Sequence, residues 1–154
     1  MLGILKTREV KTPCREGLNA GFDFYVPSDI ECDDVLNGFY INAGENCNIP
    51  SGIKVRLPKN HCLIAFNKSG IASKHNLIVG ACVVDENYTG EIHLNIINVG
   101  KDPVLVERGQ KLVQFVLIKQ IYHEICLHQG EESLYEGLDT RERGNKGFGS
   151  TGIR

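Results

Sequence analysis

The sequence feature that most constrains the fold is an alternation of apolar and polar residues with a period of two. Between Gly52 and Pro58, three aliphatic side chains alternate with two cationic ones, and the same alternation returns in residues 91–96. This period predicts β-strands with one buried face. Further strands are expected at residues 77–79, 81–84, 104–106 and 112–118.

Turn signals separate these segments, and helix signals are scarce. The 154 residues include 17 glycines, more than the roughly 7% of average usage. One short helix is expected at residues 71–75, with Ser69 as its N-cap. Many short strands with frequent turns predict an all-β sandwich or barrel, and the length predicts one domain.

A polar segment, Asp85–Gly90, lies between the apolar residues 77–84 and the alternation that begins at Glu91. Two apolar runs around a short polar connection predict a β-hairpin. The expected hairpin carries acids and one aromatic residue, Tyr88, at its tip. A carboxylate held there by rigid flanking strands would reach solvent and could act as a general base.

Charge and hydropathy exclude several classes of protein. Lysine and arginine total 17 against 19 aspartates and glutamates, a balance that disfavours direct nucleic-acid binding. The sequence contains no run of about 18 apolar residues, so no membrane-spanning helix is expected. The apolar stretch near residue 1 is too short for a signal peptide. Six cysteines without a Cys-x-x-Cys pair indicate reduced thiols. We therefore expect an intracellular protein, in the host cytoplasm if the source is viral.

The last fourteen residues differ from the rest. Residues 141–154 are rich in glycine and cations and contain only two sizeable apolar side chains. Such a segment cannot bury enough apolar surface to order itself. We expect a body at residues 1–140 and a mobile arm at 141–154 that offers donors to an anion.

Five segments in order resemble the motifs of the trimeric dUTPase family. The resemblance runs from about residue 18 to residue 152. The segments are Ala20–Phe24, Lys68–Ala72, Gly80–Gly90, Gly109–Gln114 and Arg143–Gly152.

The resemblance implies a jelly-roll-like β-barrel that assembles as a homotrimer. Family members have active sites between subunits, closed by the C-terminal arm. The implied reaction converts dUTP and water to dUMP and pyrophosphate with Mg²⁺, which limits uracil in DNA and supplies the thymidylate precursor.

The resemblance also implies roles for single residues. Asp85 would activate the water that attacks the α-phosphorus, and the ring of Tyr88 would leave no room for a 2′-hydroxyl. Asp23 would hold Mg²⁺ through water. The uracil and sugar would contact Cys82, Val83, Val84, Asp85, Tyr88 and His93. The phosphates would contact Lys68, Ser69, Gly70 and Gln114, and the arm would add Arg143, Phe148, Gly149, Ser150 and Thr151.

Several positions depart from the family pattern. Lys68 stands where arginine is common, Asn67 where proline is usual, Cys82 where glycine is common, and Gln110 where an acid is common, and Lys146 adds a cation in the arm. Two alternatives stay open. A dCTP deaminase of the same fold needs a glutamate base where this chain has Asn95, an amide that cannot accept a proton at neutral pH. A divergent member could add a regulatory role that binds a protein partner.

Overall fold

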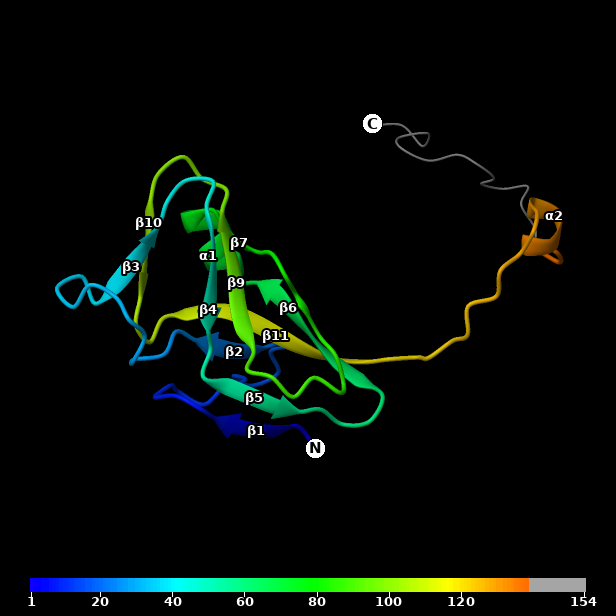
Figure 1. The fold of residues 1–154 in the computed structure, drawn as a ribbon, viewed down its shortest axis with the longest axis horizontal. Helices are drawn as coiled ribbons and strands as arrows, with labels where there is room; N and C mark the ends of the chain where they lie inside the picture. The colour runs from blue at the N-terminus through cyan, green and yellow to red at the C-terminus, as the bar shows by residue number, and fades with distance from the viewer. Residues whose placement is uncertain (139–154) are drawn as a thin grey trace. The chain divides into compact units, whose positions relative to one another are not determined.

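The computed structural model describes residues 1–138. The chain divides into two units, Met1–Tyr122 and His123–Arg154. The first unit consists of short strands and one helix (Figure 1). Its elements are β1 (Gly3–Lys6), β2 (Phe22–Tyr25), β3 (Gly38–Ile41), β4 (Asn46–Pro50), β5 (Ile53–Arg56), β6 (His61–Asn67), α1 (Ser69–His75), β7 (Leu77–Val79), β8 (Val83–Val84), β9 (His93–Asn98), β10 (Val104–Glu107) and β11 (Lys111–Lys119).

The strands form antiparallel sheets. One sheet has the order β2-β11-β6-β8, and a second has the order β4-β9-β7. The pairs β1-β5 and β10-β3 complete the set. The nine-residue β11 pairs with β2 on one side and with β6 on the other. This architecture confirms the all-β prediction.

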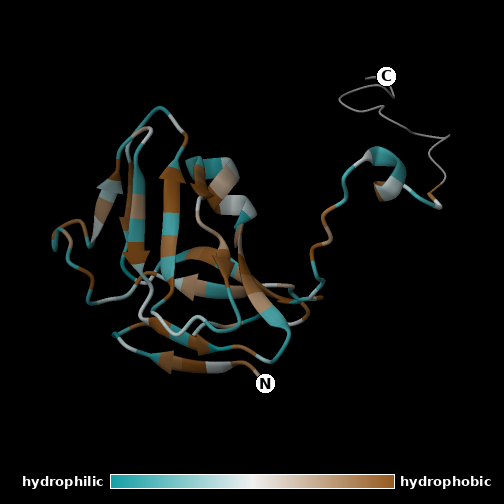
Figure 2. Ribbon diagram, turned by 45° about the vertical axis from the view of Figure 1, so that its right-hand side comes forward, coloured by the Kyte–Doolittle hydropathy of each residue, from teal (hydrophilic) through white to brown (hydrophobic). Residues whose placement is uncertain are grey.

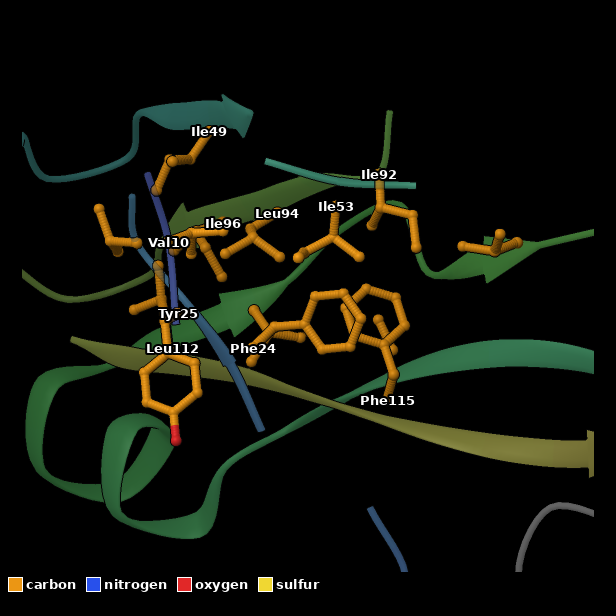
Figure 3. Packing of buried hydrophobic residues seen from close by; sticks show 14 of the residues in the cluster. Val10, Phe24, Tyr25, Ile49, Ile53, Ile92, Leu94, Ile96, Leu112 and Phe115 are labelled. Atoms are coloured by element: carbon orange, nitrogen blue, oxygen red, sulfur yellow. The ribbon is translucent and has the colours of Figure 1, made fainter. Parts of the chain in front are cut away.

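The core lies between the sheets. The rings of Phe24 on β2 and Phe115 on β11 pack with their centroids 4.4 Å apart and their planes tilted by 47°. Aliphatic side chains from β4, β5 and β9 pack near them, among them Ile49, Ile53 and Leu94 (Figure 3). Each such side chain stabilises the fold by about 1.5–3 kcal/mol when it is fully buried.

The period-two alternation is confirmed where it was strongest. On β9, Leu94 and Ile96 are buried while His93 is exposed. Apolar and polar residues alternate along several strands (Figure 2). All the predicted strand segments contain strands, at β5, β7, β8, β9, β10 and β11.

The expected simple hairpin is wrong. β7 pairs with β9, with Leu77 opposite Asn98 and Val79 opposite Ile96. β8, however, pairs with β6 in the other sheet, with Val84 opposite Leu63. The chain therefore passes from one sheet to the other at residues 80–82, between β7 and β8. Local alternation predicts that both runs are strands, but it carries no information about their partners.

The N-cap prediction for Ser69 is also wrong. Ser69 is the first residue of α1, and the N-cap is Lys68, which makes no side-chain capping hydrogen bond. The helix ends at Asn76, whose φ of 53° is left-handed and whose N–H donates to the carbonyl of Ala72. Asparagine tolerates this conformation better than most residues do.

The second unit contains a short helix, α2 (Glu131–Leu134), where only one helix in the chain was expected. No described helix, in either unit, is long and apolar enough to cross a membrane. The predicted boundary at residue 140 lies outside the described residues and stays a prediction.

Candidate active site

The residues predicted to contact the base and sugar surround one hollow of about 230 Å³, which we call the tip hollow. β8 supplies its first wall, and the core ring of Phe115 contributes to its lining. The lining residues are Ala81, Cys82, Val83, Val84, Asp85, Tyr88, Ile92, His93 and Phe115. All six residues predicted for the base and sugar are therefore together.

Three carboxylates belong to the loop at this hollow, and two of them have structural partners. Glu86 accepts a hydrogen bond from the N–H of Asn60 at 2.6 Å. Glu91 accepts one from the N–H of Gly52 at 2.7 Å and pairs with the Arg8 guanidinium at 3.2 Å. Within residues 1–138 the side chain of Asp85 has no hydrogen-bond or ion-pair partner, and it is exposed. Asp85 is the carboxylate at this hollow that is available for chemistry.

Tyr88 is held at the mouth of the tip hollow. Its hydroxyl donates to the Glu91 carbonyl at 2.8 Å, and its N–H donates to the Asp85 carbonyl at 3.1 Å. The ring lies against Gly90, where an added Cβ would overlap the phenol. The loop thus has a fixed turn between the carboxylate and the aromatic ring.

The residues predicted to contact phosphates surround a second hollow of about 470 Å³, the cationic hollow. It lies beside α1 and the start of β11. Its lining residues are Lys68, Ser69, Gly70, Ile71, Lys74, His75, Lys111 and Gln114. Three lysines in one hollow favour an anion with several charges.

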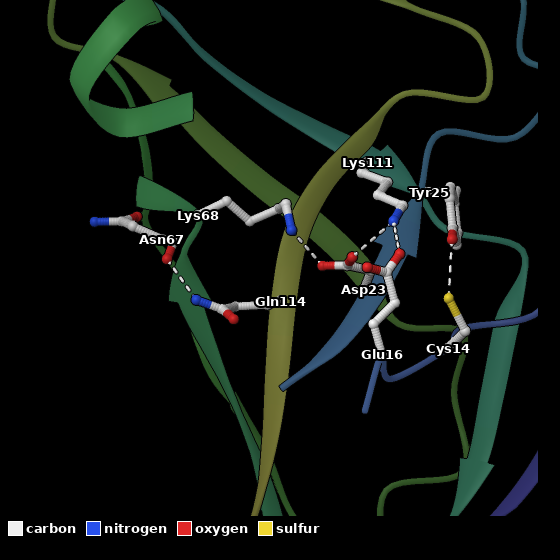
Figure 4. Close-up of polar contacts among 8 residues, drawn as sticks. All are labelled: Cys14, Glu16, Asp23, Tyr25, Asn67, Lys68, Lys111 and Gln114. Carbon is white, nitrogen blue, oxygen red and sulfur yellow. Dashed lines mark hydrogen bonds and ion pairs between the residues drawn. The ribbon is translucent and has the colours of Figure 1, made fainter. Parts of the chain in front are cut away.

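Two acids and two lysines form a chain of ion pairs next to the cationic hollow (Figure 4). Lys68 pairs with Asp23, and Lys111 pairs with Asp23 at 3.3 Å and with Glu16 at 2.6 Å. The pKa of Lys111 is raised, first by its hydrogen bond to Glu16 and then by that to Asp23. Lys111 therefore stays charged at neutral pH.

The amide of Gln114 faces the same region. Its Nε2 donates to the Asn67 carbonyl at 2.8 Å (Figure 4). Gly21 packs against this side chain, and a Cβ at residue 21 would lie 2.8 Å from Gln114 Oε1. Close packing on β11 thus explains the glycine at position 21, two residues before Asp23.

A magnesium ion fits Asp23 only as part of a larger ligand set. Among residues 1–138, no three aspartate, glutamate, histidine or cysteine side chains gather as a metal site. Asp23 offers one carboxylate, and it already faces two lysines. Because Mg²⁺ prefers six oxygen ligands and keeps several waters, this donor set fits an ion that arrives on a triphosphate.

The structure brings the predicted residues together in two groups. The tip hollow and the cationic hollow share no lining residue. The predicted arm residues, Arg143, Phe148, Gly149, Ser150 and Thr151, lie outside the described residues.

Sequence reasoning missed several residues of both hollows. Lys111 belongs to the fourth motif, but no role was assigned to it. The available signal was its position next to the buried residues of β11, which places a lysine at the edge of the core. Glu16 is 95 residues away from Lys111, so no local pattern connects the two. Lys74 and His75 lie in the last turn of α1, where a cation interacts favourably with the helix dipole.

Known proteins resemble this chain in sequence over most of its length. The family model described as dUTPase matches residues 9–152. A deoxyuridine 5'-triphosphate nucleotidohydrolase of Caldanaerobacter subterraneus is 35% identical over 136 residues, which cover 87% of this chain and 82% of that protein. The Pol polyprotein of equine infectious anemia virus is 32% identical over 135 residues, 88% of this chain. The chain spans only 10% of the length of that polyprotein.

The fold is also that of solved dUTPase structures. A G164S mutant of the Staphylococcus bacteriophage 80alpha dUTPase with dUpNHpp superposes with a TM-score of 0.79, at 20% identity and over 99% of both chains. This likeness confirms the expected jelly-roll-like fold. Since the family model covers nearly the whole sequence, the chain belongs to the dUTPase family.

Proposed function

We propose that this protein hydrolyses dUTP to dUMP and pyrophosphate, by in-line attack of water on the α-phosphorus. The observation that carries the proposal is the state of Asp85. The neighbouring Glu86 and Glu91 are engaged in holding the loop, whereas Asp85 lines the tip hollow without a partner among residues 1–138. A carboxylate so placed can orient water and accept its proton.

The cationic hollow is proposed to bind the triphosphate. Lys68, Lys111 and the amide of Gln114 would neutralise and orient phosphate oxygens. Mg²⁺ carried by the triphosphate would spread the charge of the phosphates, with Asp23 contacting it through water. For that contact, Asp23 would exchange part of its pairing with Lys68.

We propose that the working enzyme is a homotrimer with shared sites. The separation of base-binding and phosphate-binding residues into two hollows supports this, since a second copy would bring them together. The outer face of the β2-β11-β6-β8 sheet supports it too, because Phe66, Val83 and Ile118 are 45%, 58% and 38% exposed there. Exposed apolar side chains on one face favour association.

The arm, residues 141–154, is proposed to close over the bound nucleotide. Arg143 would hold the terminal phosphate, and Phe148 would stack on uracil. Closure would exclude water once the substrate is bound. Deleting the arm should reduce turnover strongly while assembly, followed by analytical ultracentrifugation, persists; unchanged turnover would contradict this role.

The deaminase alternative is weakened by the state of Asn95. Its Oδ1 accepts the N–H of Ala81 at 2.8 Å, and its Nδ2 donates to Asn48 at 2.6 Å. Both ends of the amide are therefore occupied, one by the backbone of Ala81 and the other by the side chain of Asn48. A side chain in this state offers no general base for the attack of water on cytosine.

The deciding experiment compares dUTP, dCTP, dTTP and UTP with Mg²⁺, following pyrophosphate and ammonia separately. Pyrophosphate from dUTP alone supports the proposal, and ammonia from dCTP would replace it with deamination. Asp85→Asn should abolish turnover in a protein with unchanged thermal unfolding. Asp102→Asn is the matched control, because Asp102 is an exposed aspartate outside both hollows.

A further inference from the structure

Glu86, the residue after the proposed catalytic base, joins two distant segments of the first unit. One carboxylate oxygen, Oε2, accepts the N–H of Asn60 at 2.6 Å and the hydroxyl of Tyr122 at 3.0 Å. Asn60 precedes Glu86 by 26 residues and Tyr122 follows it by 36. A single side chain thus links the loop to the turn before β6 and to the segment that follows β11.

Asn60 is itself held in place, and Tyr122 has a second possible acceptor. Asn60 has a φ of 60° in the turn between β5 and β6, and its carbonyl accepts the N–H of Gln120 at 2.7 Å. The Tyr122 hydroxyl also contacts Gln120 Oε1 at 2.7 Å. Because the charged carboxylate is the stronger acceptor, the single hydroxyl proton belongs in the bond to Glu86.

The bond between Tyr122 and Glu86 favours the protonated phenol. The hydrogen bond to Glu86 is the largest of the effects that raise the pKa of Tyr122. The phenol therefore remains protonated and remains a donor. The Asn60 N–H is a backbone donor and carries no titration at all.

These groups surround a third hollow of about 570 Å³, which Asp85 also lines. Asp85 thus stands between this hollow and the tip hollow. On its N-terminal side, the backbone is fixed by the pairing of β8 with β6. On its C-terminal side, the fixed point is the carboxylate of Glu86.

We propose that Glu86 is a positioning residue that sets the direction of the Asp85 carboxylate through its bonds to Asn60 and Tyr122. The inference rests on the proposed function, since it assigns Asp85 the role of activating water. A base displaced by about 1 Å loses about 100-fold in rate. The bonds of Glu86 therefore act on the chemical step rather than on nucleotide binding.

The test measures kcat and KM for dUTP separately. Glu86→Ala should lower kcat by about 100-fold with little change in KM. Glu86→Gln keeps one oxygen acceptor for the Asn60 N–H and should recover part of the loss. Tyr122→Phe removes one of the two bonds and should lower kcat by about 5- to 10-fold.

A double-mutant cycle separates this coupling from unrelated damage. If Tyr122 acts through Glu86, the double variant Glu86→Ala/Tyr122→Phe should be no slower than Glu86→Ala alone. Additive losses would overturn the proposal, as would an unchanged kcat in Glu86→Ala. The controls are Glu107→Ala and Tyr40→Phe, two exposed side chains away from the three hollows.

Hydrogen exchange supplies a readout that does not depend on activity. In folded Glu86→Ala, the Asn60 amide should exchange faster than in the wild type, while core amides of β11 keep their protection. Unchanged exchange at Asn60 would overturn the structural link. A wild type that exchanges as expected but releases no pyrophosphate from dUTP would instead overturn the proposed function.

Discussion

Asn95 on β9 holds the backbone of Ala81 by a hydrogen bond of 2.8 Å from the Ala81 N–H to Asn95 Oδ1. The bond occurs where the chain has left β7 and has not yet joined β8. Ala81 lines the tip hollow. The side chain of Asn95, which belongs to the β4-β9-β7 sheet, therefore holds one wall of the tip hollow. The next wall residues, on β8, belong to the β2-β11-β6-β8 sheet.

Asn95→Ala should weaken both the fold and the hollow. The Ala81 N–H loses its acceptor, and the side-chain oxygen Oδ1 of Asn48 loses the amide that donates to it at 2.6 Å. Leaving such groups unpaired costs about 1–3 kcal/mol when water cannot replace the partner. We expect a lower free energy of unfolding in urea and a raised KM for dUTP. Asn46→Ala, an exposed asparagine on β4, should change neither, and a silent Asn95→Ala would contradict the role.

Gly80→Ala should be destabilising for a steric reason. A Cβ at residue 80 would overlap Asn95 Oδ1 and approach Ile97 Cδ1 to 3.1 Å. Asn95 could move only by giving up its bond to Ala81, and overpacking of this kind costs about 1–3 kcal/mol. Thermal unfolding should show the loss. In a background that already carries Asn95→Ala, Gly80→Ala should cost less, and an equal cost in both backgrounds would refute the explanation.

The strands could be predicted because their signal is local. On β5 the core residue Ile53 is followed by Lys54, and on β9 the core residue Leu94 is followed by Asn95, so the buried face is readable from a few residues. The change of sheet at residues 80–82 was not readable in this way. It depends on the pairing of the two-residue β8 with Leu63 and Ile64 of β6. It also depends on Asn95, which accepts the N–H of Ala81 from fourteen residues away.

The site was predictable where a motif carries it. Asp85 and Tyr88 were assigned from the resemblance, and both line one hollow, while their roles stay predictions. The supports of the site were not found, because they join segments far apart: Glu16 to Lys111, and Glu86 to Asn60 and Tyr122. Nothing in the sequence near Glu86 distinguishes a supporting carboxylate from a catalytic one. That distinction came from the partners of each group.

Tyr88 gives a prediction about sugar discrimination. Its ring packs over Gly90, and its hydroxyl donates to the Glu91 carbonyl at 2.8 Å. Tyr88→Ala removes the ring and should lower the preference for dUTP over UTP, measured as the ratio of kcat/KM values, by about 10-fold or more. Tyr88→Phe keeps the ring and should keep the ratio, although loss of the loop bond lowers kcat. Equal ratios in both variants would remove the ring from this role.

The last prediction concerns stability in alkali. The buried Tyr25 hydroxyl contacts Cys14 Sγ at 3.0 Å (Figure 4), and this hydrogen bond, followed by burial, raises the pKa of Tyr25 above its ordinary 10.0. The unfolded chain therefore loses this proton first as the pH rises. The stabilisation is complete below pH 10.0 and is lost as the pH climbs through the folded-state pKa.

The free energy of unfolding of the wild type should fall as the pH rises above 10.0. In Tyr25→Phe this fall should be smaller. Burial also raises the pKa of the Cys47 thiol above 9.0, so part of the alkaline loss should persist in Tyr25→Phe and begin earlier. Tyr40→Phe is the matched control, because Tyr40 is 52% exposed. Urea titrations across the alkaline range decide the matter: identical slopes for wild type and Tyr25→Phe would mean that this phenol ionises as freely in the folded protein as in the unfolded chain.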